Sequence, residues 1–254
     1  PLKVAENFKL LEALHPGRID LGIGRAPGSD RVTAAALAYG SSVGIEYFPA
    51  KTADLKAFLT GDKPLTDGLE KVAATPLLEA PPELWMLGSS EDGARLAAHF
   101  GLPFAYAHFI NPDPMARACD VYRRKFRPSE RVPEPVISLA VFALCADTQE
   151  EAERLGRCRD LWGVRVHRGE FAPFPSIEEA EAYEFSPEEA EYMANRQGKQ
   201  ILGTQDQVAQ QLADLAERAG AEELAVVSIT HDFQARVRSY ELLAAIDWGW
   251  SAGG

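Results

Sequence analysis

Two short segments of this sequence place glycines beside groups that bind anions. The first is Leu21 to Gly28 (LGIGRAPG), in which Arg25 directly follows Gly24. A glycine lets a ligand approach closely, and a guanidinium binds phosphate through several N–H groups. The alternative is that Arg25 makes a structural ion pair. The G-x-G spacing lacks the further glycines of a dinucleotide fingerprint, so it is weak evidence for NAD.

The second segment is Leu87 to Gly93 (LGSSEDG), in which Gly88 precedes two serines. We expect a strand to end at Gly88 and a helix to be capped by Ser89 or Ser90. The free N–H groups at a helix start form an anion site together with the positive end of the helix dipole, and a serine hydroxyl can add a donor. The alternative is that the serine only caps the helix.

Two histidines, His108 and His231, each follow a predicted strand. Either can contact a ligand there, or serve as a local hydrogen-bonding residue. The sequence holds no H-E-x-x-H, no G-x-S-x-G and no P-loop, so a zinc peptidase or a hydrolase triad has no support. We therefore assign no metal ligand and no catalytic residue from the sequence.

These segments belong to a chain in which predicted strands and helices alternate. Five strands are predicted, over residues 18–24, 83–88, 102–107, 136–146 and 223–229. The alternation predicts an α/β fold with a parallel sheet, which binds ligands at the carboxyl ends of its strands.

The helices between these strands are predicted from spacing and caps. The first helix is indicated by four apolar residues at helical spacing: Val4, Phe8, Leu11 and Leu14. A second signal is the capping box that opens at Thr204. Residues 149–162 are predicted to be helical and residues 163–200 irregular. Within the latter, Ser176 to Glu191 holds seven glutamates and no basic residue, which predicts an acidic surface insertion.

The composition is that of a soluble globular protein. The chain has 254 residues, 46% hydrophobic and 25% charged, with a net charge of −12. A surface with this much negative charge repels phosphate backbones and anionic lipid. We therefore expect neither nucleic acid nor membrane partners. No apolar run is long enough to span a membrane, and no signal peptide is visible. The spacing of Cys119, Cys145 and Cys158 predicts free, mostly buried thiols in a cytoplasmic protein.

Three segments, in the same order along the chain, resemble the bacterial luciferase-like flavin-dependent monooxygenases. They are Glu6 to Asp30, Glu83 to Pro112 and Ile201 to Leu212. The resemblance implies a (β/α)8 TIM barrel that binds FMN at the carboxyl ends of its strands. It also implies a mobile lid at about residues 163–175.

The resemblance assigns roles to the two glycine-containing segments. Arg25 matches the arginine that binds the flavin phosphate, and Ser89 and Ser90, after Gly88, match the second phosphate contact. Gly24 stands where luciferases proper carry a reactive cysteine, which argues against a light-emitting enzyme.

The implied activity is a monooxygenase reaction. Reduced FMN from a separate flavin reductase would react with O2, and one oxygen atom would enter an aldehyde-like or other small organic substrate. The resemblance also implies a homodimer. Alternatives are an F420-dependent dehydrogenase on the same barrel, a non-catalytic FMN-binding protein, and a phosphosugar enzyme on an ordinary TIM barrel.

The number of strands bears on the extent of the chain. Five strands correspond to the last five of a barrel, so we expect residues 1–254 to be the carboxyl-terminal part of one domain. Three β/α units, on the order of 80 residues, would then precede Pro1. Family residues that lie against the flavin ring would fall in that part.

Overall fold

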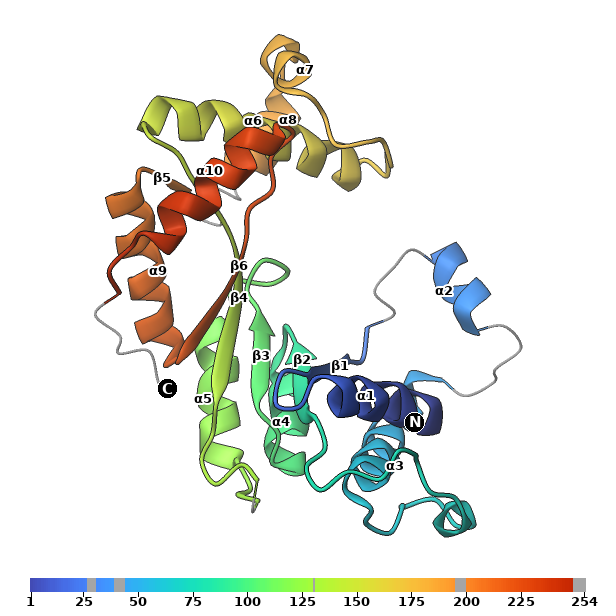
Figure 1. The fold of residues 1–254 in the computed structure, drawn as a ribbon. Helices are drawn as coiled ribbons and strands as arrows, with labels where there is room; N and C mark the ends of the chain where they lie inside the picture. The colour runs from blue at the N-terminus through green and yellow to red at the C-terminus, as the bar shows by residue number, and fades with distance from the viewer. Residues whose placement is uncertain (27–30, 39–43, 130, 195–199, 249–254) are drawn as a thin grey trace. The chain divides into compact units, whose positions relative to one another are not determined.

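The computed structural model describes residues 1–26, 31–38, 44–129, 131–194 and 200–248 (Figure 1). The chain packs into two compact units. The first comprises Pro1–Ala107 and Asp113–Ser138, and the second comprises His108–Pro112 and Leu139–Gly254. Gly28, at the end of the first glycine-containing segment, lies outside the described residues. That residues 1–254 form one domain stays a prediction.

The first unit alternates strands with helices. Its elements are α1 (Leu2–Leu14), β1 (Asp20–Gly24), α2 (Arg31–Ala38), η1 (Ile45–Tyr47), α3 (Phe48–Thr60), η2 (Leu69–Lys71), β2 (Glu83–Gly88), α4 (Glu91–Phe100), β3 (Phe104–Ala107) and α5 (Met115–Lys125). Strands β1, β2 and β3 are parallel neighbours in that order. All three predicted strands are confirmed, and their carboxyl ends lie side by side.

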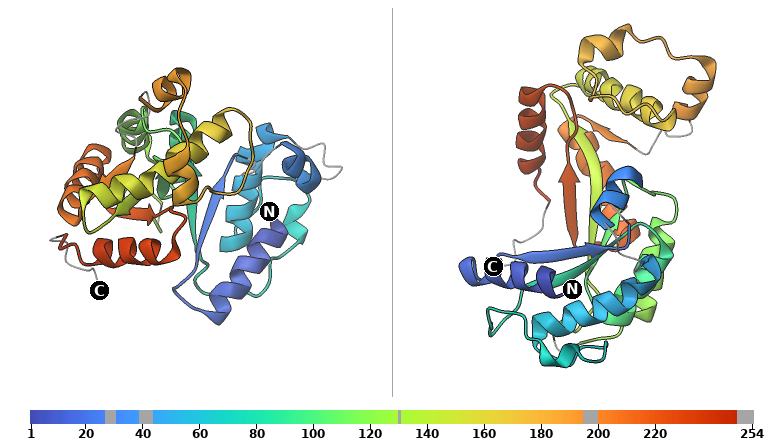
Figure 2. Two further views of the ribbon diagram at one scale, coloured as in Figure 1. Left: turned by 90° about the horizontal axis from the view of Figure 1, so that it is seen from above. Right: turned by 90° about the vertical axis from the view of Figure 1, so that its right-hand side faces the viewer.

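Helix α1 confirms the predicted helix, but three of the four apolar residues that indicated it lie outside its buried side, which is formed by Ala5, Lys9 and Glu12. Val4, Leu11 and Leu14 are 39%, 41% and 62% exposed, whereas Lys9 and Glu12 are buried. The ammonium of Lys9 donates to the carbonyls of Phe58, at 3.4 Å, and Ala74, at 2.9 Å. These hydrogen bonds satisfy the buried polar group as α1 packs beside α3 (Figure 2), so apolar spacing alone did not identify the packed face.

The second unit is built around the long strand β4. Its elements are β4 (Ile137–Cys145), whose first two residues still belong to the first unit, α6 (Gln149–His167), α7 (Ile177–Ala182), α8 (Pro187–Ala194), β5 (Ile201–Gly203), α9 (Gln205–Ala219), β6 (Glu223–Val227) and α10 (Phe233–Ala244). β5 pairs with β4 in parallel, and β6 also pairs with β4.

Strand β5 corrects the predicted strand count, because the described residues form six strands and not five. Three residues are too few to show a period of two. β5 also directly precedes the predicted capping box at Thr204, which the structure confirms at the start of α9. The nearly continuous burial of β4 agrees with its continuous apolar sequence.

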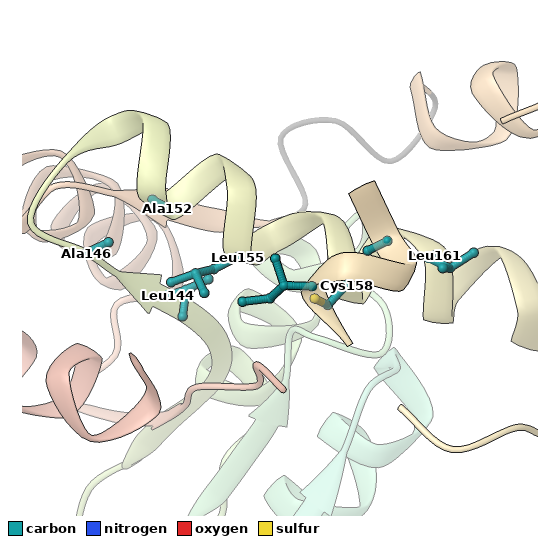
Figure 3. Close-up of a cluster of buried hydrophobic side chains, with 8 residues drawn as sticks. Leu144, Ala146, Ala152, Leu155, Cys158 and Leu161 are labelled. Carbon is teal, nitrogen blue, oxygen red and sulfur yellow. The ribbon is translucent and has the colours of Figure 1, made fainter. Parts of the chain in front are cut away.

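Helix α6 packs on the carboxyl end of β4. Figure 3 shows Leu144 and Ala146, at the end of β4 and just beyond it, beside Ala152, Leu155 and Cys158 of α6; all five are at most 6% exposed. Apolar contacts of this kind are the main stabilising contribution to a core.

The segment predicted to be irregular, residues 163–200, is largely helical where the structure describes it. Helix α6 continues to His167, so the expected lid at about 163–175 begins inside a helix. α7 and α8 follow, and both lie beside α6 in Figures 1 and 2. Arg165 of α6 pairs with Glu179 at 2.6 Å, and Arg168 pairs with Glu189 at 2.9 Å. Arg165 and Arg168 thus supply the basic ion-pair partners that the acidic segment itself does not contain.

Tyr122 of α5 connects the segments that lead into β3 and β4. Its hydroxyl donates to the carbonyl of Leu102 at 3.0 Å and accepts from the amide of Val136 at 3.1 Å. We expect Tyr122→Phe to lower the free energy of unfolding by about 1–3 kcal/mol, because it leaves buried backbone groups without a partner. Urea denaturation measures this, with the exposed Tyr47→Phe as control. Equal midpoints for the two variants would contradict the prediction.

Candidate functional site

The parallel register of the first unit brings the two glycine-containing segments together. Gly24, the last residue of β1, lies opposite Leu87 of β2, and Gly88 lies opposite Tyr106 of β3. Arg25 therefore leaves the end of β1 next to the turn from β2 into α4. Its guanidinium lies 3.9 Å from the carboxylate of Asp92 in the first turn of α4.

Ser90 caps helix α4, as the sequence predicts. Its side chain accepts a hydrogen bond from the amide of Gly93 at 3.4 Å, and the helix begins at Glu91. Capping satisfies one of the four free amides of a helix start and leaves others for solvent or a ligand. Capping and anion binding are therefore compatible at this helix start.

The glycines that end β1 and β2 have different steric roles. A Cβ on Gly88 would lie 3.2 Å from Cε2 of Phe104 and 3.4 Å from the Cα of Gly93. A side chain at position 88 would therefore be tightly packed and would require Phe104 or Gly93 to shift by a few tenths of an ångström. A Cβ on Gly24 would meet the carbonyl oxygen of Leu87 at 3.5 Å, an ordinary contact, so the space there accepts a side chain.

Three arginines surround the start of α4. Arg25 faces Asp92, Arg95 pairs with both Glu91 and Asp92, and Arg117 of α5 pairs with Glu91. Three cations facing two carboxylates leave one net positive charge. Ion pairs this exposed contribute little to stability, with a median of about 0–1 kcal/mol. An incoming dianion can therefore compete with Asp92 for Arg25.

Tyr106 is a site residue that the sequence reasoning missed. Its side chain is fully buried, and its hydroxyl donates to the carbonyl of Ser89 at 3.2 Å. This hydrogen bond holds the backbone at Ser89, the first of the two serines. The only sequence signal was the alternation in FAYA, which places Phe104 and Tyr106 on the same side of β3.

The two candidate histidines lie in the second unit. His108 is buried, and its backbone amide donates to the carbonyl of Ala140 at 2.9 Å. His231 is exposed after β6. The candidate phosphate site described above consists of first-unit residues and includes neither histidine.

The three cysteines are free and buried, as predicted. Burial raises the pKa of each thiol, to about 11 for Cys119, which keeps these thiols protonated and unreactive at neutral pH. Within the described ranges, no three His, Cys, Asp or Glu residues are grouped to hold a metal ion. No described helix is long and apolar enough to cross a membrane.

Comparison with known proteins identifies the class. The sequence model of the luciferase-like monooxygenase family matches residues 1–223. A "Luciferase-like monooxygenase" of Escherichia coli K12 is 35% identical over 95% of this chain and 71% of its own length. The crystal structure of apo-MsnO8 is 38% identical, with a TM-score of 0.84 over 96% of this chain and 72% of that chain. The chain belongs to the luciferase-like monooxygenase family.

Two more distant structures share the fold. An FMN complex of the oxygenating constituent of 3,6-diketocamphane monooxygenase from Pseudomonas putida is 19% identical, with a TM-score of 0.63 over 96% of this chain and 74% of that chain. An F420-dependent secondary alcohol dehydrogenase in complex with an F420-acetone adduct is 14% identical, with a TM-score of 0.65 over 97% of this chain and 75% of that chain. These luciferase-like TIM-barrel neighbours confirm the predicted fold class.

The buried phenol of Tyr106 predicts how stability depends on pH. Burial, with smaller contributions from Cys119 and Asp113, raises the pKa of Tyr106 to about 12. The unfolded chain loses this proton near pH 10 and the folded chain retains it, so stability falls as pH rises from about 10 to 12. We expect the wild type to lose on the order of 2 kcal/mol more than Tyr106→Phe across this interval. Urea midpoints at pH 8, 10 and 11.5 measure the difference.

The exposed Tyr47→Phe variant is the control for this measurement. It should follow the wild type through the alkaline range. The prediction is contradicted if Tyr106→Phe loses stability above pH 10 as steeply as the wild type does.

Proposed function

We propose that this chain acts as a monooxygenase that uses reduced FMN and O2 to oxygenate a small organic substrate, with electrons from a separate flavin reductase. Family membership supports a small-molecule substrate and O2. The observation that carries a phosphate-bearing cofactor such as FMN is the juxtaposition of Arg25 with the amino end of α4, which forms a cationic cradle for a phosphate.

The residues of the first unit fit the phosphate of a flavin nucleotide. Arg25 supplies a guanidinium that is 45% exposed, and the first turn of α4 supplies backbone amides. Ser89 and Ser90 supply hydroxyl groups, and Gly88 keeps the turn open to close approach. Helix starts are common binding sites for phosphate for these reasons. The flavin would supply the redox chemistry, while these groups bind and orient it.

Two further parts of the proposal concern the state of the protein. We propose that it is a homodimer, as its family resemblance implies, which sedimentation equilibrium tests directly. We also propose a reducing, cytoplasmic environment. The three buried, unpaired cysteines support this, because extracellular proteins of this size tend to pair their thiols.

The second candidate is an F420-dependent dehydrogenase, which the fold neighbour bound to an F420 adduct supports. Titration with reduced FMN and with F420 separates the two cofactors. A third possibility, a non-catalytic FMN-binding protein, would bind FMN without consuming O2. Oxygen uptake with reduced FMN, combined with product mass over a substrate panel, tests the main proposal. FMN binding without any oxygenated product from the panel would contradict it.

Arg25→Ala tests the phosphate site. We expect it to weaken binding of reduced FMN by about 10- to 100-fold, since a hydrogen bond to a charged group contributes about 1.5–3 kcal/mol. Binding of reduced riboflavin, which has no phosphate, should not change. Anaerobic calorimetry measures both affinities. Arg18→Ala, exposed just before the amino end of β1, is the control. An equal loss for FMN and riboflavin would show that Arg25 does not act on the phosphate.

A further inference from the structure

The second unit contains a pocket that the phosphate site does not use. Its volume is about 270 Å³, near the lower end of the ~300–1,000 Å³ typical of small-molecule sites. Phe109 and Ile110, which follow β3, form part of the wall, together with Phe142 of β4, Trp162 of α6 and Met193 of α8. Most of the lining is therefore aromatic or aliphatic.

On one wall of this pocket, two phenylalanine rings stack on each other and an arginine guanidinium lies over one of them. Phe109 stacks on Phe142, with ring centroids 4.5 Å apart and planes 20° apart. The guanidinium carbon of Arg159 lies 4.4 Å from the centroid of Phe142. Stacking on an aromatic face fixes the plane of a guanidinium, and its N–H donors then point outward around its edge. The pocket thus combines an apolar body with a positioned cation.

The pocket lining also contains an anionic residue, Asp160. The carboxylate of Asp160 accepts a hydrogen bond from the side-chain amide of Gln200. The cation of Arg159 cannot lose its charge at any accessible pH. An acceptor that enters the pocket therefore meets a permanent cation on one wall and a hydrogen-bonded carboxylate beside it.

Helix α8 supplies part of the pocket lining and packs against α6. Tyr192, which also lines the pocket, stacks on His167 of α6 with centroids 4.2 Å apart. Glu189 of the same helix accepts hydrogen bonds from Arg168 and Tyr183, each at 2.9 Å. These contacts hold the short helix against α6.

We infer that this pocket receives the organic substrate, and that the substrate class is a small molecule with a flat, apolar or aromatic body and a carboxylate end that binds Arg159. The inference rests on the proposed function, because it takes the ligand to be the molecule that is oxygenated. The location is consistent with it: Phe142 lies toward the carboxyl end of β4, and ligands of α/β folds bind at such strand ends.

The test uses two probes of nearly equal shape, the anionic 4-phenylbutanoate and the neutral 4-phenylbutanamide, with calorimetry on the full chain. We expect the wild type to bind the carboxylate about tenfold more tightly than the amide, which corresponds to ~1.4 kcal/mol. Arg159→Ala should abolish this preference. Arg157→Ala, an exposed arginine of the same helix outside the pocket lining, should retain it. Phe142→Leu should weaken both probes together.

The outcomes test the pocket assignment and the proposed function separately. The inference is overturned if the wild type binds the probes equally, if neither binds at millimolar concentration, or if Arg157→Ala loses the preference as Arg159→Ala does. Urea midpoints near that of the wild type show that a variant is folded. Oxygen uptake is measured separately with reduced FMN. Probe selectivity without oxygenation would refute the proposed function alone, and oxygenation without probe selectivity would refute this pocket assignment alone.

Discussion

The parallel hydrogen bonding of β1, β2 and β3 is the constraint on which the candidate phosphate site depends. A parallel register makes all three strands end at the same edge, so Gly24 and Gly88 become neighbours although they lie 64 positions apart in the chain. A shift of one residue would turn Arg25 and the serine turn to other faces. The buried hydrogen bond from Tyr106 to Ser89 secures the third strand to the same turn.

Local charge at this edge differs from the charge of the whole chain. The protein carries a net charge of −12, yet the start of α4 is surrounded by three arginines and two carboxylates. The amino end of the helix adds a further partial positive charge. Such an arrangement attracts a small phosphate ester, while the acidic surface elsewhere disfavours polyanions. The charges therefore favour a nucleotide cofactor over a nucleic acid.

The two units contribute different kinds of surface. The first unit supplies a polar cradle in which backbone amides, hydroxyls and a guanidinium converge. The second supplies an aromatic pocket whose cation, Arg159, is positioned by stacking on Phe142. The first kind of surface suits a phosphate group, which is bound by charge and hydrogen bonds, and the second suits an organic molecule, which is bound mainly by desolvation. The chain's family is established by comparison, whereas the substrate role of the pocket is a proposal drawn from its lining.

Local sequence patterns were enough to predict the alternation of strands and helices, the caps at Ser90 and Thr204, and the two strand ends that carry Arg25 and the serines. These features depend on periods and turn residues that act within a few positions of the chain. Tertiary packing places Lys9, and not Leu11, toward the interior, and it brings the hydroxyl of Tyr106 to the carbonyl of Ser89. It alone also revealed β5, the folded acidic segment and the ring stack beneath Arg159. Those features arise from partners distant in sequence, whose hydrogen bonds and packing outweigh local hydrophobic spacing.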